Sequence, residues 1–202
     1  MLVTVSMKPK SRKRGRVLTA LGLLIVGVAV GALVWLLASP GASNSRALAG
    51  QTLKIMPDPK PAVVNKDTAP AMPGLNVRGQ DVVGVLTIPD FGRDFPVLSA
   101  MDKTARFPGV YAGAANNGTL IIGVSSYLPG FSGLTSLQDG AQIRFTAVTG
   151  EQYSYRVLTA ESIPATDASK LSSGDDWDLT LYTPSLSGVQ FEIIRATAVV
   201  SE

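Results

Sequence analysis

The chain has 202 residues, 46% of them hydrophobic and 16% charged, and it contains neither cysteine nor histidine. The lack of both residue types excludes disulfides, thiol nucleophiles, imidazole bases and Cys/His zinc sites, and we expect no metal or other cofactor. The formal net charge of +3 is local, because six of the 18 basic residues lie within residues 8–16; the remaining 12 face 15 acidic residues, and we expect no nucleic-acid partner.

Residues 17–38 are an apolar segment that follows a basic one. These 22 positions carry no charge and can cross a hydrocarbon layer of about 30 Å as a helix. The basic residues 1–16 predict a cytoplasmic tail, which places everything after Ala38 outside the cell. The alternative is a cleaved signal peptide, for which Ala-Leu-Ala at 47–49 offers a cleavage site, but the apolar run is longer than a signal sequence needs. We expect a single-pass membrane protein with its C-terminal domain extracellular.

Residues 39–75 are rich in proline and show little apolar periodicity. Proline fixes φ and removes a backbone donor, so this composition predicts an extended stalk between the membrane anchor and the domain.

From residue 76 the pattern changes to short apolar runs separated by turns. We expect strands at 81–88, 95–98, 116–123, 141–148, 152–163, 177–183 and 189–200, and helical turns within 131–137 and 166–171. In one strand Ile143 and Phe145 alternate with Arg144 and Thr146, which places the two pairs on opposite faces. Seven or eight short strands without a long amphipathic helix predict an all-β barrel or sandwich at 76–202.

Five segments of this domain together resemble the sortases, the membrane-anchored cysteine transpeptidases of Gram-positive bacteria. They are GVLTIPDFGRDFPVL, NNGTLIIG, FSGLTSLQDGAQIRFTAVTGEQYSYRV, WDLTLYTP and VQFEIIRATAV. Their order and spacing carry the resemblance, and the apolar N-terminal segment agrees with it. The resemblance implies a closed, sortase-like β-barrel of seven to eight strands with a peptide groove, preceded by one transmembrane helix.

The resemblance also implies three site positions, and each carries an unreactive residue here. In working sortases a cysteine thiolate attacks the peptide bond, a histidine protonates the leaving amine and an arginine stabilises the oxyanion. The corresponding positions are Pro184, Val124 and Phe191, with a shift of one or two residues left open for the last. Proline offers neither a nucleophile nor an N–H, and valine and phenylalanine neither transfer protons nor donate hydrogen bonds. We therefore expect an inactive sortase homologue.

Two alternatives use other residues. Ser185, Ser125 or Ser126 would be a nucleophile only beside a base. Without histidine that base would be a lysine, an aspartate or a glutamate, and among the lysines Lys103 and Lys170 are the first candidates. Otherwise these hydroxyls bond the local backbone.

Asp175, Asp176 and Asp178, around Trp177, suggest either a calcium site or a solvated turn.

The three apolar substitutions allow two outcomes for the former site. Either the patch closes on itself and stabilises the barrel, or an open groove binds a peptide without cutting it. The residues expected to line such a groove are Ser125, Ser126, Tyr127, Leu128, Phe131, Thr183 and Ser185. For residues 125–131 the other interpretation is a loop whose apolar side chains cap the barrel.

We therefore expect a sortase-like pseudoenzyme on the outer membrane face, with a binding or accessory role in surface-protein anchoring or pilus assembly. Its expected partners are sorting-signal peptides, surface proteins or an active sortase. The alternatives are a serine-dependent peptidase or transpeptidase on the same fold, and a purely structural envelope protein.

Overall fold

The computed structural model describes residues 40–102, 107–124, 128, 131–172 and 176–199, with side chains from Asn44 onward. The predicted tail at 1–16 and the predicted membrane anchor at 17–38 lie outside these residues. Within the described ranges, every helix is too short or too polar to span a membrane.

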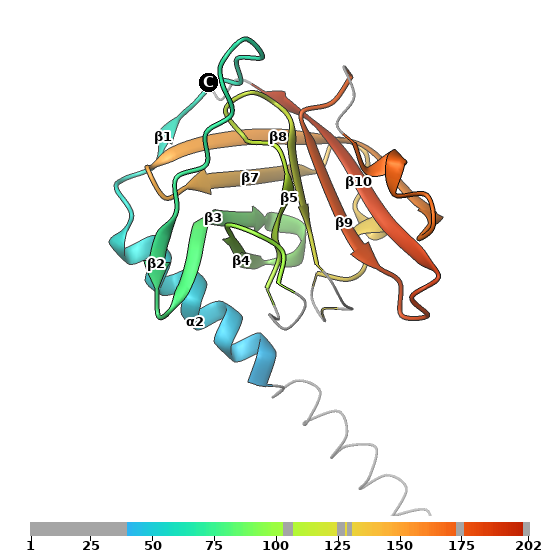
Figure 1. Ribbon diagram of the computed structural model, residues 1–202, viewed down its shortest axis with the longest axis horizontal. Coiled ribbons are helices and arrows are strands. Elements are labelled where there is room, and N and C mark those ends of the chain that lie inside the picture. The colour runs from blue at the N-terminus through green and yellow to red at the C-terminus, as the bar shows by residue number, and fades with distance from the viewer. Residues whose placement is uncertain (1–39, 103–106, 125–127, 129–130, 173–175, 200–202) are drawn as a thin grey trace, which may run out of the picture. The chain divides into compact units, whose positions relative to one another are not determined.

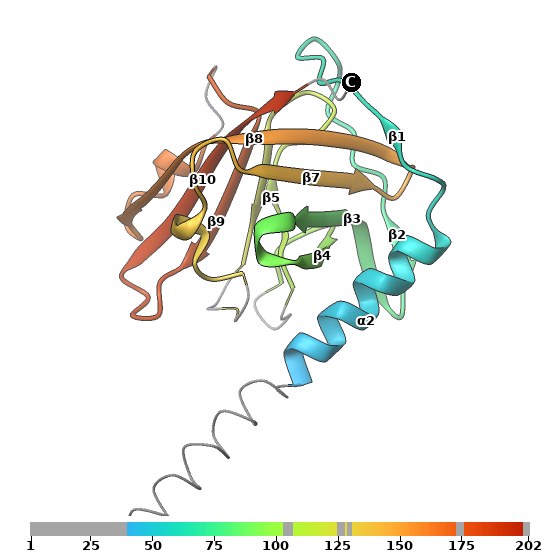
Figure 2. The same cartoon turned by 180° about the vertical axis from the view of Figure 1, so that it is seen from behind.

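Eight strands close into a barrel (Figure 1), and the view from behind in Figure 2 shows β7 and β8 side by side. In the order of their pairing they are β8 (Glu151–Pro164), β10 (Gln190–Val199), β9 (Leu179–Pro184), β6 (Leu120–Gly123), β5 (Gly109–Ala112), β4 (Arg93–Leu98), β3 (Gln80–Ile88) and β7 (Gln142–Ala147). The circle closes because β7 pairs with both β3 and β8. Neighbours run antiparallel except β4 with β5 and β6 with β9. The predicted all-β barrel is confirmed.

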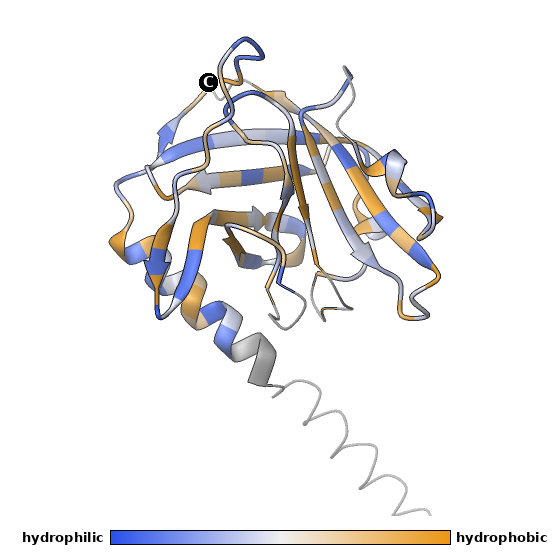
Figure 3. Cartoon of the chain, in the orientation of Figure 1, coloured by the Kyte–Doolittle hydropathy of each residue, from blue (hydrophilic) through white to orange (hydrophobic). Residues whose placement is uncertain are grey.

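The inward-facing residues of these strands fill the barrel. Ile143 and Phe145 are fully buried, whereas Arg144 between them is exposed, as the alternation predicts. Thr146, expected on the exposed face with Arg144, is instead only 4% exposed. Its cross-strand neighbour Gln152 covers it and donates a hydrogen bond to its hydroxyl over 3.1 Å. The hydropathy colouring in Figure 3 shows the resulting mixture of apolar and polar positions along each strand.

Three short 3-10 helices lie in the connections: η1 (Pro89–Phe91), η2 (Leu134–Ser136) and η3 (Ala168–Leu171). The last two lie within the predicted helical turns. Leu134 and Leu171 are the buried residues of η2 and η3. Each turn is therefore held to the barrel by one leucine.

The predicted extended stalk at 39–75 needs correction, because its first part is the helix α2 (Pro40–Ile55). Ser45, Leu48, Ala49 and Thr52 are its buried residues and recur at the spacing of one helix face. Leu48 packs with residues of β2 (Leu75–Val77), β3 and β4, in a cluster that comprises Leu48, Val77, Val82, Leu98 and Val148. The helix is therefore part of the folded unit.

The second part of the expected stalk is extended but lies against the barrel. We call residues 60–72 the strap. Its strand β1 (Lys60–Pro61) pairs in parallel with the start of β8, and Ala62 N donates to Gln152 O over 2.9 Å. Further on, the Asn116 side chain donates to Ala69 O and accepts from Ala71 N. Ala62, Val64 and Met72 pack on the core. The strap is extended, as its composition predicts. Its position against the barrel is set by these hydrogen bonds and by the burial of its apolar side chains.

Candidate functional site

Three adjacent strands, β6, β9 and β10, end close together and bring the three predicted site positions to one end of the barrel wall. Gly123 of β6 is the partner of Tyr182 in the parallel ladder, so Val124, the next residue, lies beside the end of β9. Pro184, the last residue of β9, is the direct cross-strand partner of Phe191 in β10. The backbone therefore places the three positions on neighbouring strand ends.

The side chain of Val124 points into the barrel. It is 4% exposed and belongs to the core cluster together with Leu120 and Ile122 of the preceding strand. The Val124 side chain therefore packs against apolar neighbours and neither donates nor accepts a proton.

Phe191 lies on the face of the barrel wall opposite to the one from which Val124 enters the core. Successive residues of a strand alternate between these two faces. On its face Phe191 packs against a group that we call the outer cluster. The outer cluster consists of Ile121, Ile163, Leu171, Tyr182 and Ile193, with Met101 and Phe191 partly buried against it. Leu171 comes from η3, so the connection between β8 and β9 folds over this face. Apolar packing surrounds Val124 and Phe191, whereas Glu192, next to Phe191, accepts a hydrogen bond from Gly133 N over 3.1 Å.

Tyr182 fills the surface next to Pro184. It is 4% exposed, and its ring lies so close to Gly123 that a Cβ at that position would be 2.2 Å from Tyr182 Cε1. Its hydroxyl donates to Met101 Sδ over 2.8 Å. The rings of Phe191 and Tyr111 meet it edge-on, with centroids 5.3 Å and 5.7 Å away. Burial, and then the neighbouring Tyr111, raise the pKa of Tyr182, so it stays a neutral phenol.

Comparison with known proteins gives structural matches only, since no protein-family model and no curated protein sequence matches the chain. Sortase A from Corynebacterium diphtheriae, a lid mutant, matches with a TM-score of 0.53 at 20% identity, over 81% of this chain and 97% of that one. Sortase C-3 from Streptococcus pneumoniae matches with a TM-score of 0.52 at 19% identity, over 79% and 82%.

The match to Clostridium perfringens sortase C, solved with the C-terminal cell wall sorting motif, has a TM-score of 0.51 at 18% identity, over 60% of this chain and 72% of that one. The domain has a sortase fold. It is a sortase fold without the catalytic cysteine, because the chain contains no cysteine at all.

Ser185 follows Pro184, the residue predicted to stand at the cysteine position, and the structure shows it in the turn between β9 and β10. Its hydroxyl lies 3.1 Å from the Ser187 hydroxyl and accepts from Gln190 N over 3.3 Å. Neither partner is a base. Lys170, one of the two lysines considered, pairs with Asp167 instead, at 3.2 Å. Ser125, Ser126 and Lys103 lie outside the described residues. The local-backbone role predicted as the alternative is the one seen for Ser185.

Among the residues predicted to line a groove, those that the structure describes do not share one exposed surface. Leu128 and Phe131 are 8% and 0% exposed and belong to the barrel core, where the Phe131 ring meets Phe95 edge-on at 5.2 Å. Thr183 is fully buried as well. Tyr127 lies outside the described residues. For Leu128 and Phe131 the structure shows the alternative, a loop whose apolar side chains enter the barrel, because burying them removes more apolar surface from water.

An arginine does stand on the last strand of this sortase fold, four residues after the predicted position. Arg195 forms an ion pair with Glu161 of β8, donates from Nη2 to Lys170 O over 3.2 Å, and lies 4.4 Å above the centre of the Trp177 ring. These contacts tie the connection between β8 and β9 to β10. The role of Arg195 is therefore structural, because its contacts hold this connection in place. The alternation along β10 predicts on which face of the strand Arg195 lies. Its partners lie in other segments of the chain, so the sequence pattern does not predict these contacts.

Asp178, predicted to belong to a calcium site or to a solvated turn, is a buried residue of the sortase fold. It is 7% exposed and accepts hydrogen bonds from Ala198 N at 2.7 Å and the Thr197 hydroxyl at 3.2 Å. Lys66 of the strap pairs with it at 3.6 Å. Asp176 is exposed, and Asp175 is not described. In the described ranges no three acidic residues gather closely enough to hold a metal ion, and Asp178 instead joins the strap to β10.

Proposed function

We propose that this protein is a noncatalytic member of the sortase fold, held at the outer face of the cell membrane by residues 17–38, that binds a peptide or protein during surface-protein anchoring or pilus assembly. The observation that carries the proposal is chemical. At the ends of β6, β9 and β10 stand Val124, Pro184 and Phe191, all apolar, in a chain without cysteine or histidine. Loss of a reacting group removes catalysis by factors of about 10⁴–10⁶.

Exposed apolar side chains beside this site support a binding role. Leu186 and Val189, in the turn that joins Pro184 to Phe191, are 82% and 67% exposed, and Tyr111 of β5 is 50% exposed where it meets Tyr182. Through its contact with Tyr182, Tyr111 extends the outer cluster toward solvent. Apolar side chains gathered at one place on a surface are typical of interaction sites. Binding needs only such contacts, whereas transpeptidation needs reactive groups as well.

The partner that the fold favours is a sorting-signal peptide. The Clostridium perfringens sortase C was solved with the C-terminal cell wall sorting motif, which supports a sorting-signal peptide as the partner. An active sortase or a surface protein is the second class of partner to examine.

The test uses the full chain in lipid nanodiscs and a fluorescent sorting-motif peptide, with binding followed by anisotropy and peptide integrity by mass spectrometry. We expect binding without cleavage. Replacing Leu186 and Val189 together by serine removes two apolar side chains and weakens binding about tenfold or more. Leu158→Ser on β8, where the leucine is 43% exposed, is the matched control and leaves binding unchanged.

Two results would overturn parts of the proposal. Cleavage of the peptide contradicts the noncatalytic role. No binding at high micromolar concentration to the peptide or to an active sortase contradicts the binding role and favours a structural envelope protein.

A further inference from the structure

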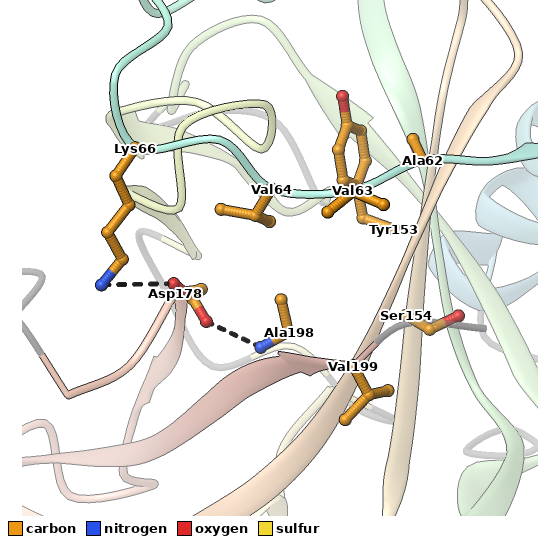
Figure 4. A pocket seen from close by; sticks show the side chains of 9 residues that line it. All are labelled: Ala62, Val63, Val64, Lys66, Tyr153, Ser154, Asp178, Ala198 and Val199. Atoms are coloured by element: carbon orange, nitrogen blue, oxygen red, sulfur yellow. Dashed lines mark hydrogen bonds and ion pairs between the residues drawn. The ribbon is translucent and has the colours of Figure 1, made fainter.

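A pocket of about 210 Å³ lies between the strap and the strands β8 and β10, close to the start of β9 (Figure 4). Its apolar wall comes from Ala62, Val63 and Val64 of the strap and from Ala198 and Val199 of β10, with Tyr153 beside them. Asp178 and Lys66 lie together at one end, as Figure 4 shows. The volume exceeds the cavity of about 150 Å³ that holds benzene in an engineered protein, so a small organic group fits.

The two charged groups of the pocket differ in how firmly they are held. The Asp178 carboxylate is fixed by hydrogen bonds from Ala198 N and the Thr197 hydroxyl, and its side chain is 11% exposed. The Lys66 side chain is 56% exposed and lies 3.6 Å from that carboxylate. A long exposed lysine side chain can turn toward water at little cost, whereas a buried carboxylate cannot leave. Of the two opposite charges, the negative one is therefore held more firmly.

We propose that this pocket binds a small molecule in which a primary ammonium group is joined to a short apolar body. The ammonium replaces that of Lys66 on the Asp178 carboxylate, which already shows that this carboxylate accommodates such a group. The apolar body lies between Val64 and Val199. An anionic ligand is disfavoured, because it would stand next to a fixed carboxylate. This site is separate from the one under the proposed function, since it lies at the opposite end of β9.

Two sources provide this chemistry, a free amine and the N-terminal residue of a peptide. The experiment separates them by titrating the full chain in detergent with isopentylamine and with the dipeptide Val-Gly, each followed by methyl NMR. We expect isopentylamine to shift the methyl signals of Val64, Ala198 and Val199. Isopentyl alcohol, which has the same body without charge, binds about tenfold more weakly or less, and isocaproate does not shift these signals. If Val-Gly binds and its N-acetyl form does not, the site accepts peptide N-termini; if only isopentylamine binds, it takes free amines.

Two variants and one control make the test decisive. Lys66→Ala removes the competing ammonium and strengthens amine binding several-fold without changing alcohol binding. Asp178→Asn keeps an acceptor oxygen but removes the charge, and it weakens amine binding about tenfold or more. Lys60→Ala, at an exposed lysine of the same strap, has no effect. Equal affinity for amine and alcohol, weaker amine binding in Lys66→Ala, or no shift of the three methyl signals each overturns the proposal, and the Lys66→Ala result decides even if Asp178→Asn does not fold.

Discussion

The two ends of β9 carry opposite chemistry. Just before its first residue, Asp178 places a buried carboxylate among backbone and side-chain donors and pairs with Lys66 of the strap. At its last residue, Pro184 offers no side-chain donor, acceptor or nucleophile, and the neighbouring surface is occupied by Tyr182 and Phe191. One strand therefore has a buried carboxylate just before its start, and it ends at a proline whose neighbouring surface is largely apolar.

The middle of the strand explains how both ends can differ so much. Leu179 and Leu181 are fully buried in the core, and β9 pairs along its length with β6 and β10. These contacts fix the position of the strand whatever stands at its ends. A fold can therefore persist while the chemistry at its strand ends changes, which is why function has to be argued from the site.

The largest expected effect is at the charged end. Asp178→Ala leaves Ala198 N and the Thr197 hydroxyl without their acceptor, so we expect the free energy of unfolding to fall by about 3 kcal/mol. Asp178→Asn keeps an acceptor oxygen, so we expect its free energy of unfolding to fall by about half as much. Chemical denaturation of the full chain measures both. An alanine variant as stable as the wild type would mean that the carboxylate does not anchor the strap and β10.

The packed end gives the next effect. Gly123→Ala places a Cβ within 2.2 Å of the Tyr182 ring, and overpacking of this kind costs about 1–3 kcal/mol. Gly50→Ala in α2 is the control, because no atom lies within 4 Å of its Cβ. There alanine stabilises the helix by up to about 1 kcal/mol. Equal thermal unfolding temperatures for the two variants would show that Tyr182 does not fill this surface.

A smaller effect tests the hydroxyl of Tyr182. Tyr182→Phe removes the hydrogen bond to Met101 and costs about 1 kcal/mol or less at neutral pH. Because the folded pKa of this phenol is raised, its contribution to stability is complete below pH 10 and is lost as the pH rises further toward that pKa. We therefore expect the stability of the phenylalanine variant to fall less steeply above pH 10 in urea titrations. Identical slopes would contradict the buried, neutral phenol.

The smallest expected effect is on activity. Pro184→Cys places a thiol at the position that the sequence resemblance predicts for the sortase cysteine, but no imidazole exists in the chain to act with it. We expect a thiol that reacts with a disulfide reagent and no cleavage of a sorting-motif peptide above background by mass spectrometry. Turnover, or an accumulated acyl-enzyme, would show that the apolar end of β9 still supports the reaction.

Several parts of the fold were predictable from local pattern, and others were not. Alternation in Ile143, Phe145 and Tyr155 marks strands because a barrel wall has one face inside and one outside. The strand β5 escaped prediction, since Gly109–Ala112 is short and Tyr111 within it is half-exposed. The helix α2 escaped because Ser45, Ala49 and Thr52 contribute small or polar side chains to its buried face, which leaves little apolar signal.

For the candidate site, the sequence by itself determined which reactions are absent, because a chain without cysteine and histidine has no thiolate and no imidazole in any conformation. Only the tertiary structure decided where the remaining side chains lie. In the folded chain Phe131 is buried in the core, and the Tyr182 ring lies over Gly123. Lys66 pairs with Asp178, which is 112 residues further along the chain. Residue types set the available chemistry, whereas contacts between distant segments depend on packing and burial, which no local pattern encodes.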